Sequence, residues 1–196
     1  MPSSNDAIFI LSALNADAQN GPAAQRAILA AACAKNLKPD VVDLPSTKVQ
    51  ACYGCGACGL TTPGVCAVQD PMQQVFPRIV RSRVWVLASP IRFGTHHSEL
   101  KKALDRCQPL MVPLYTMRGG EMNFLPRYSP APALLGIGLL ARADPDQEAA
   151  YRALLERHGG NLAMKAGAAV LLASDSAAQA QAKVERALAD LLEARR

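Results

Sequence analysis

The chain has 196 residues, of which 50% are hydrophobic and 5% aromatic, and it carries a net charge of +5. This length and apolar content suit a single domain, residues 1–196, with a sizeable core. The basic residues are scattered and the aromatic side chains are few, which argues against a nucleic-acid surface. No apolar run approaches the roughly 18 residues of a membrane span, and the first residues do not resemble a signal peptide, so we expect a cytoplasmic protein.

Short apolar runs alternate with helical patterns along the chain, and each run predicts a buried parallel strand. The expected strands are 7–12, 40–44, 83–89, 134–141 and 166–174. The expected helices are 21–36, 71–82, 98–107, 145–158 and 176–196, several of which begin at Asp–Pro or Gly–Pro signals. Five strands linked by helices or long crossovers predict an α/β fold with an open, doubly wound parallel sheet.

Two segments interrupt this alternation. Residues 51–70 form a cysteine-rich segment after the second strand, and residues 108–133 form an irregular excursion rich in Pro, Gly, Met and Tyr. Connections of that length without secondary structure are uncommon and are usually functional or disordered. We therefore expect the excursion to cover a ligand or to meet another subunit.

The cysteine-rich segment holds four cysteines in the spacing C-x2-C-x2-C-x7-C. Structural zinc sites usually pair two C-x2-C knuckles a dozen or more residues apart. Three cysteines at consecutive three-residue steps instead match the loop that ligates three corners of a cubane iron–sulfur cluster. An iron–sulfur site is favoured, with zinc, thiol redox chemistry and a purely structural role as alternatives. The candidate metal ligands are Cys52, Cys55, Cys58 and Cys66.

Two motifs together resemble the iron–sulfur flavoprotein group of the flavodoxin-like, NADPH-dependent FMN reductase superfamily. They are CYGCGACGLTTPGVCAVQDPM at 52–72 and VWVLASPIRFGTHHSELKKALDR at 84–106. The resemblance implies a flavodoxin-like fold with strand order 2-1-3-4-5, FMN at the carboxyl ends of the strands, and a [4Fe–4S] cluster held by the four cysteines. It also implies a homodimer or homotetramer that brings flavin and cluster close enough for electron transfer.

The place for FMN has independent support, because doubly wound sheets bind ligands beyond the strand carboxyl ends at the topological switch point. After the third strand, backbone amides and a flat surface would meet the flavin ring, and the Arg92 cation would stabilise reduced flavin. The candidate residues there are Pro90, Ile91, Arg92, Phe93 and Gly94.

The loop after the first strand is the candidate phosphate site, since amides at a helix N-terminus bind anions. Its candidate ligands are Ser12, Asn15, Asn20 and Gly21. The arginine and threonine that the family usually has in this loop are absent, and Asp17 adds a negative charge.

The favoured function is a redox flavoprotein that carries FMN and one [4Fe–4S] cluster. It would pass electrons between a ferredoxin-like donor and a small-molecule acceptor, with no nucleic-acid or membrane partner. The alternatives are an NAD(P)H-dependent FMN or quinone reductase without a cluster, and a non-enzymatic electron carrier or redox sensor. Elsewhere, we expect His96 and His97 to be an exposed pair at a helix entry, with flavin tuning or proton relay as the alternative role. We expect Asp105 and Arg106 to form a structural ion pair.

Overall fold

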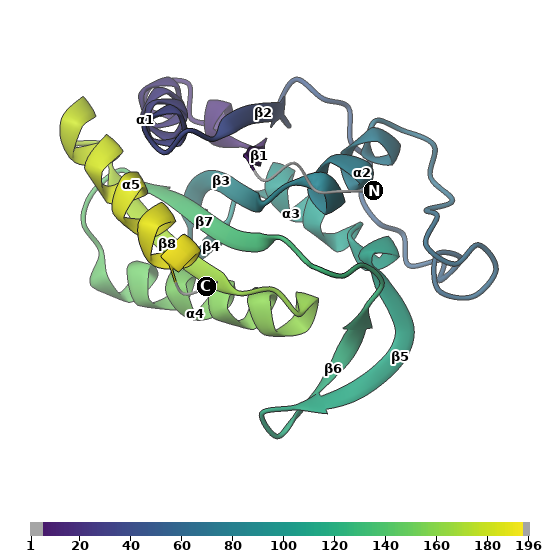
Figure 1. Cartoon of the computed structure of the whole chain (residues 1–196). Coiled ribbons are helices and arrows are strands. Elements are labelled where there is room, and N and C mark those ends of the chain that lie inside the picture. Colours follow the sequence, from purple (N-terminus) through teal and green to yellow (C-terminus); the bar gives the residue numbers. More distant parts are fainter. Residues whose placement is uncertain (1–5, 194–196) are drawn as a thin grey trace.

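The computed structural model describes residues 6–193 and shows an α/β fold with a mostly parallel central sheet (Figure 1). The parallel strands are β1 (Ala7–Ser12), β2 (Lys38–Asp43), β3 (Val84–Arg92), β7 (Ala133–Leu140) and β8 (Ala166–Leu172). The α-helices are α1 (Gly21–Ala34), α2 (Met72–Arg81), α3 (Ser98–Asp105), α4 (Pro145–Leu162) and α5 (Ala177–Glu193). The α/β class and the parallel sheet predicted from the sequence are confirmed; the last three residues of the predicted C-terminal helix lie outside the described range.

The parallel strands lie in the order β2-β1-β3-β7-β8. The two-residue strand β4 (Thr95–His96) pairs antiparallel with the end of β3, so this sheet has six strands where the sequence predicts five. β3 also continues beyond the predicted range, because Pro90 is in register with Leu139 of β7 and Ile91 with His96 of β4. Residues 90–92 therefore end a strand instead of forming a loop.

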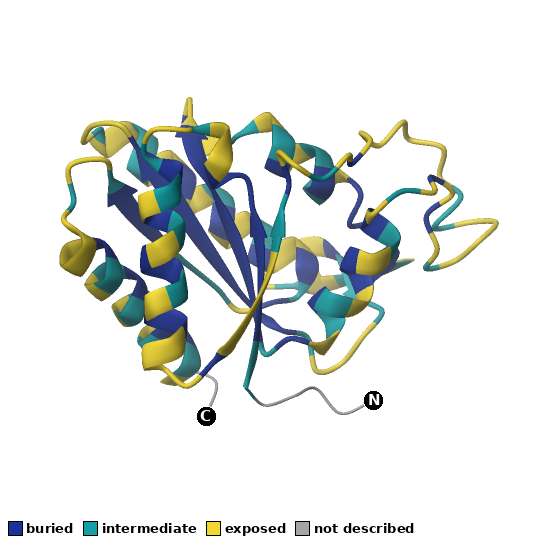
Figure 2. Cartoon of the chain, turned by 90° about the horizontal axis from the view of Figure 1, so that it is seen from above, coloured by how far each residue is buried: buried dark blue, intermediate teal, exposed yellow. Residues whose placement is uncertain are grey.

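Successive residues of a strand point to opposite faces, and the sheet accordingly has a core on each side. In β3, Val84 and Val86 belong to a core with α1 and α5, while Trp85 and Leu87 belong to a core with α2, α3 and α4. Figure 2 shows these buried strands between helices whose outer faces are exposed. Among residues 6–193, no helix is both long enough and apolar enough to cross a membrane.

Two glycines in β7 let α4 lie close to the sheet. A Cβ atom on Gly136 would stand 2.4 Å from Cγ of Leu155, and one on Gly138 would stand 2.9 Å from Cε1 of Tyr151. Side chains at these positions would overlap with α4, which explains why a buried strand contains two residues of low strand propensity.

The excursion 108–133 is not irregular, contrary to the expectation. It begins with the 3-10 helix η2 (Gln108–Leu110) and continues as an antiparallel hairpin of β5 (Met111–Arg118) and β6 (Glu121–Pro126), which extends away from the sheet in Figure 1. Gly119 and Gly120 have φ of +57° and +80°, as a primed hairpin turn requires. The sequence does not reveal this hairpin because much of it is exposed, so apolar residues do not mark one buried face. Its large exposed apolar side chains are Leu114, Tyr115, Met117 and Met122.

Candidate functional site

Three segments leave the carboxyl ends of neighbouring strands. They are the loop 13–20 after β1, which contains the 3-10 helix η1 (Leu14–Ala16), the segment 44–71 after β2, and the turn between β3 and β4. At the end of β1, Ser12 is in register with Asp43 of β2 and with Ala88 of β3. Because parallel strands end at one edge of a sheet, these segments form the rim of the edge where doubly wound folds bind ligands.

The turn between β3 and β4 presents an aromatic ring to solvent. Phe93 is 97% exposed and has φ of +52°, the left-handed region that costs a residue with a side chain about 1–2 kcal/mol. The pairing of β3 with β4 closes the turn, and the N–H of Gly94 donates to Oε1 of Gln147 at 3.3 Å. The surrounding structure therefore holds Phe93 in a strained conformation in which its ring has no packing role.

The five residues predicted to contact a flavin ring differ in exposure. Pro90, Ile91 and Gly94 are buried, whereas Arg92 and Phe93 are exposed. Nη1 of Arg92 donates to the carbonyl oxygen of Ile91 at 3.1 Å, which holds the guanidinium close to the turn. Arg92 and Phe93 are therefore the side chains of this set that a bound ring can reach, and a flat ring beside a cation fits an isoalloxazine.

The predicted phosphate ligands have partners within the chain. Oγ of Ser12 donates to Oε1 of Gln25 at 2.7 Å, and Nδ2 of Asn15 donates to Oδ1 of Asp43 at 3.0 Å. The side-chain amide of Asn20 donates to the Asp17 carboxylate. The side-chain donors expected to face a phosphate are thus engaged in internal hydrogen bonds.

Asp17 lies where an anion would approach the start of α1. Its Oδ1 accepts the N–H groups of Gln19 and Asn20 at 3.2 and 3.1 Å, and its carbonyl oxygen accepts the N–H of Gly21 at 2.9 Å. η1 packs tightly over this loop, since a Cβ atom on Gly21 would stand 2.0 Å from the carbonyl oxygen of Leu14. The side chains of Arg92 and Phe93 are thus open at the rim, whereas the Asp17 carboxylate occupies loop amides that a phosphate would need.

Residues 44–71, which include the cysteine-rich segment 51–70, contain no helix or strand. Cys52 and Cys55 are exposed, Cys58 is half-buried and Cys66 is buried. Burial raises the pKa of the Cys58 thiol, and the other three thiols raise it further, so all of them lie within electrostatic reach of Cys58. Their assignment as metal ligands stays a prediction, because no group of three His, Cys, Asp or Glu side chains among residues 6–193 is arranged to hold a metal ion. Thiols are the donors that iron–sulfur clusters use, each thiol binding a different iron.

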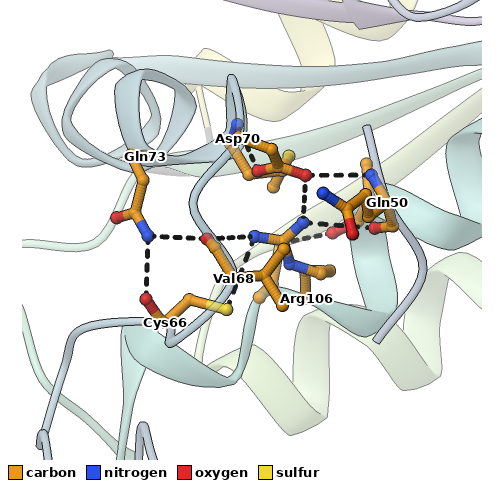
Figure 3. A network of polar contacts seen from close by, with 9 residues as sticks. Gln50, Cys66, Val68, Asp70, Gln73 and Arg106 are labelled. Atoms are coloured by element: carbon orange, nitrogen blue, oxygen red, sulfur yellow. Dashed lines mark hydrogen bonds and ion pairs between the residues drawn. The ribbon is translucent and has the colours of Figure 1, made fainter. Parts of the chain in front are cut away.

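A buried guanidinium joins the two ends of this segment to α3 (Figure 3). Arg106 follows the last residue of α3 and is 1% exposed. Its Nη1 donates to the carbonyl oxygen of Gln50 at 3.1 Å and forms an ion pair with Asp70. Its Nη2 donates to Sγ of Cys66 at 3.4 Å and to the carbonyl oxygen of Val68 at 3.2 Å.

Asp70 completes this network from the start of α2. It accepts the N–H groups of Gln50 at 2.9 Å and Met72 at 3.0 Å, in agreement with its predicted role as a helix-start residue. Burial alone would raise the pKa of Asp70, but the hydrogen bonds from Arg106 and from these two amides lower it. The predicted Asp105–Arg106 pair is wrong, because Asp105 pairs with Lys101 on the exposed side of α3. Sequence reasoning missed the Arg106–Asp70 pair, which joins residues 36 positions apart.

His96 is buried, contrary to the expectation of an exposed pair. It is 4% exposed, lies parallel to His158 with ring centroids 5.5 Å apart, and meets Tyr151 edge to face at 5.2 Å. Neither ring nitrogen of His96 has a hydrogen-bond partner within the described part of the chain. Burial, with the nearby charges of His158 and Lys101, lowers the pKa of His96 to about 3, so this ring is neutral near pH 7.

Comparison with curated proteins gives a partial match, and no family model matches the chain. An iron–sulfur flavoprotein of Methanocaldococcus jannaschii is 24% identical over 111 residues, which are 57% of this chain. The match spans 49% of that relative, about half of its length.

Solved structures match almost the whole chain. An NAD(P)H:quinone oxidoreductase from Methanothermobacter marburgensis has a TM-score of 0.66 and 11% identity, and the match covers 97% of both chains. An FMN-dependent NADH-azoreductase from Bacillus anthracis, in complex with FMN, has a TM-score of 0.63 and 12% identity, and the match covers 94% of this chain and 98% of the other. At these identities the likeness concerns the fold. The chain therefore has a flavodoxin-like α/β fold, which it shares with these two oxidoreductases.

Proposed function

We propose that the chain is a flavin-dependent oxidoreductase in which the flavin ring lies on the β3–β4 turn. The observation that carries this proposal is Phe93, an exposed ring on a strained backbone beyond the central strand. Strained residues cluster at ligand sites, where the strain serves positioning. The turn also lies beside the topological switch point between β1 and β3, from which the chain proceeds to opposite sides of the sheet. The fold shared with flavin-dependent oxidoreductases supports the same proposal.

The residues of the turn have distinct roles in this proposal. Phe93 offers the stacking surface, and Arg92 provides a cation that favours a reduced, negatively charged ring. The buried Ile91 and Gly94 hold the turn in place. A bound flavin supplies the conversion between one-electron and two-electron transfer. FMN is the flavin named for the structurally similar azoreductase, and we propose it here.

We further propose that Cys52, Cys55, Cys58 and Cys66 hold a [4Fe–4S] cluster. The name of the curated relative, an iron–sulfur flavoprotein, supports this assignment, as do the spacing of the cysteines and the electrostatic effect of the other three thiols on Cys58. Gly54 and Gly56, with φ of +70° and +71°, give the loop tight turns between its first three cysteines. A one-electron donor of the ferredoxin type and a small-molecule acceptor are the partners that suit such a pair of centres.

A second candidate is an NAD(P)H-dependent FMN or quinone reductase without a cluster. It is favoured by the exposure of Cys52 and Cys55 and by the absence, within residues 6–193, of side chains arranged to hold a metal ion. The names of the two structural relatives fit it as well. Under either candidate we propose a homodimer or homotetramer, since the exposed apolar side chains of the β5–β6 hairpin offer a surface for self-association.

The deciding experiment is an absorption spectrum of anaerobically purified protein, with iron, zinc and flavin quantified on the same sample. About four irons per chain, a dithionite-sensitive shoulder at about 400 nm and released FMN would support both centres. Flavin without iron would favour the reductase candidate, which an assay with NADPH and a quinone then tests. Protein that neither retains nor binds flavin would overturn the proposed function.

A further inference from the structure

We propose that Arg106 is a positioning residue for a thiolate-held centre: its guanidinium holds Cys66 in place and stabilises the electron that the centre accepts. This inference rests on the iron–sulfur part of the proposed function and adds a residue that lies outside the cysteine segment. The Arg106 side chain comes from the end of α3, 40 positions along the chain from Cys66, and reaches its sulfur through the core.

The contacts of Arg106 leave its guanidinium little freedom to move. Nη1 and Nη2 each have two acceptors, which belong to Gln50, Asp70, Cys66 and Val68. Nε is buried and has no hydrogen-bond partner in the part of the chain that the structure describes. Cys66 is also fixed from its backbone, because Nε2 of Gln73 donates to its carbonyl oxygen at 2.8 Å. Cys66 is therefore held through both its side chain and its backbone, in a buried position, whereas Cys52 and Cys55 are exposed.

The Arg106 guanidinium places a positive charge directly beside the sulfur of Cys66. The Asp70 carboxylate pairs with Nη1 of Arg106 and also accepts the N–H groups of Gln50 and Met72. The sulfur of Cys66 lies on the Nη2 side of the cation, in a buried environment where electrostatic interactions are strong. A cation and an N–H donor beside a ligating sulfur stabilise the more negative, reduced state of the centre, which raises its reduction potential.

A purely structural role for Arg106 makes a different prediction. The same contacts tie residue 50 and residues 66–70 to α2 and α3, so loss of the side chain would lower the melting temperature in either case. If Arg106 acted only as a structural clamp, its loss would not change the reduction potential of a centre that still assembles. The reduction potential therefore separates the two roles.

The test is a redox titration of the reconstituted, anaerobic full-length protein with dithionite, followed by absorbance and electron paramagnetic resonance. We compare the wild type with Arg106→Gln, Arg106→Lys and Asp70→Asn. Arg78→Gln is the control, because Arg78 forms its ion pair with Asp40 of β2. Iron per chain and melting temperature are measured on each sample.

Arg106→Gln should lower the equilibrium constant for reduction about tenfold, which corresponds to about 59 mV for a one-electron couple. Arg106→Lys keeps the charge and should fall between Arg106→Gln and the wild type. Asp70→Asn removes the counter-charge while an asparagine still accepts amide hydrogen bonds, and it should shift the potential in the positive direction. Arg78→Gln should leave the potential unchanged.

Three results would overturn the inference. A wild-type potential in Arg106→Gln, despite a lower melting temperature, would leave Arg106 as a structural clamp only. If Arg106→Gln fails to assemble a centre, the potential of Asp70→Asn decides instead. A potential equal to or below that of the wild type would likewise leave Arg106 as a structural clamp only. A wild-type protein that assembles no iron centre would overturn both this inference and the iron–sulfur part of the proposed function. That outcome is distinct from one in which the centre forms and Arg106 has no effect on it.

Discussion

Replacement of Phe93 separates what its ring contributes to stability from what it contributes to ligand binding. The ring is 97% exposed and the backbone has φ of +52°. Phe93→Gly removes the left-handed strain of about 1–2 kcal/mol and adds about 0.5–1 kcal/mol of backbone entropy to the unfolded state. We therefore expect Phe93→Gly to be as stable as the wild type or about 1 kcal/mol more stable. Phe93→Ala keeps the strained φ, and its stability should stay within about 0.5 kcal/mol of the wild type.

Flavin binding should respond in the opposite direction. Both variants lose the stacking surface, worth about 0.5–1.5 kcal/mol, which corresponds to a roughly two- to twelvefold weaker Kd. Phe93→Trp keeps a flat ring and should retain most of the affinity.

Urea unfolding of the flavin-free protein and quenching of flavin fluorescence measure these two effects. A loss of stability above about 1.5 kcal/mol in Phe93→Ala would show that the ring has a packing role. Unchanged flavin affinity in both small-residue variants would refute the β3–β4 turn as the ring site.

Three further substitutions test other parts of the structure. Asp17→Asn removes the negative charge from the phosphate loop, so the Kd for FMN should fall about fivefold or more. Riboflavin has no phosphate, and its Kd in the same quenching assay should stay constant. His96 has a pKa of about 3 in the folded protein and about 6.5 when unfolded, so only the unfolded state gains its proton as the pH falls below 6.5. Unfolding free energy should therefore decrease by up to about 1.4 kcal/mol per pH unit between pH 6.5 and 3, and His96→Phe should flatten that slope in urea titrations at several pH values. Gly136→Ala should lower the unfolding free energy by about 1–3 kcal/mol, because the new Cβ would overlap with Leu155. Its control is Gly160→Ala, at an exposed helix position with open space, which should be neutral or stabilising. Equal effects of the two variants in urea unfolding would contradict the close packing of α4.

The sequence by itself determined the α/β class and the approximate position of each parallel strand. Runs such as 7–12 and 134–141 are apolar on both faces, and only a sheet covered on both sides buries such strands. Asp70 and Asp144 mark helix starts through local hydrogen bonds to amides two or three residues away, which a linear pattern contains in full. These features are local, and local chemistry specifies them.

Only the tertiary structure decided which side chains at the site can contact a ligand and which are bound to partners within the chain. Ser12 and Asn15 look like phosphate ligands in the sequence, but partners 13 and 28 residues away occupy them. Arg106 reaches Cys66 over 40 positions, a contact that depends on how α3 packs beside the cysteine segment. His96 is buried because β4 returns its side chain toward α4, where it meets His158. Contacts between distant segments depend on how whole elements pack, and no short window of sequence contains that information.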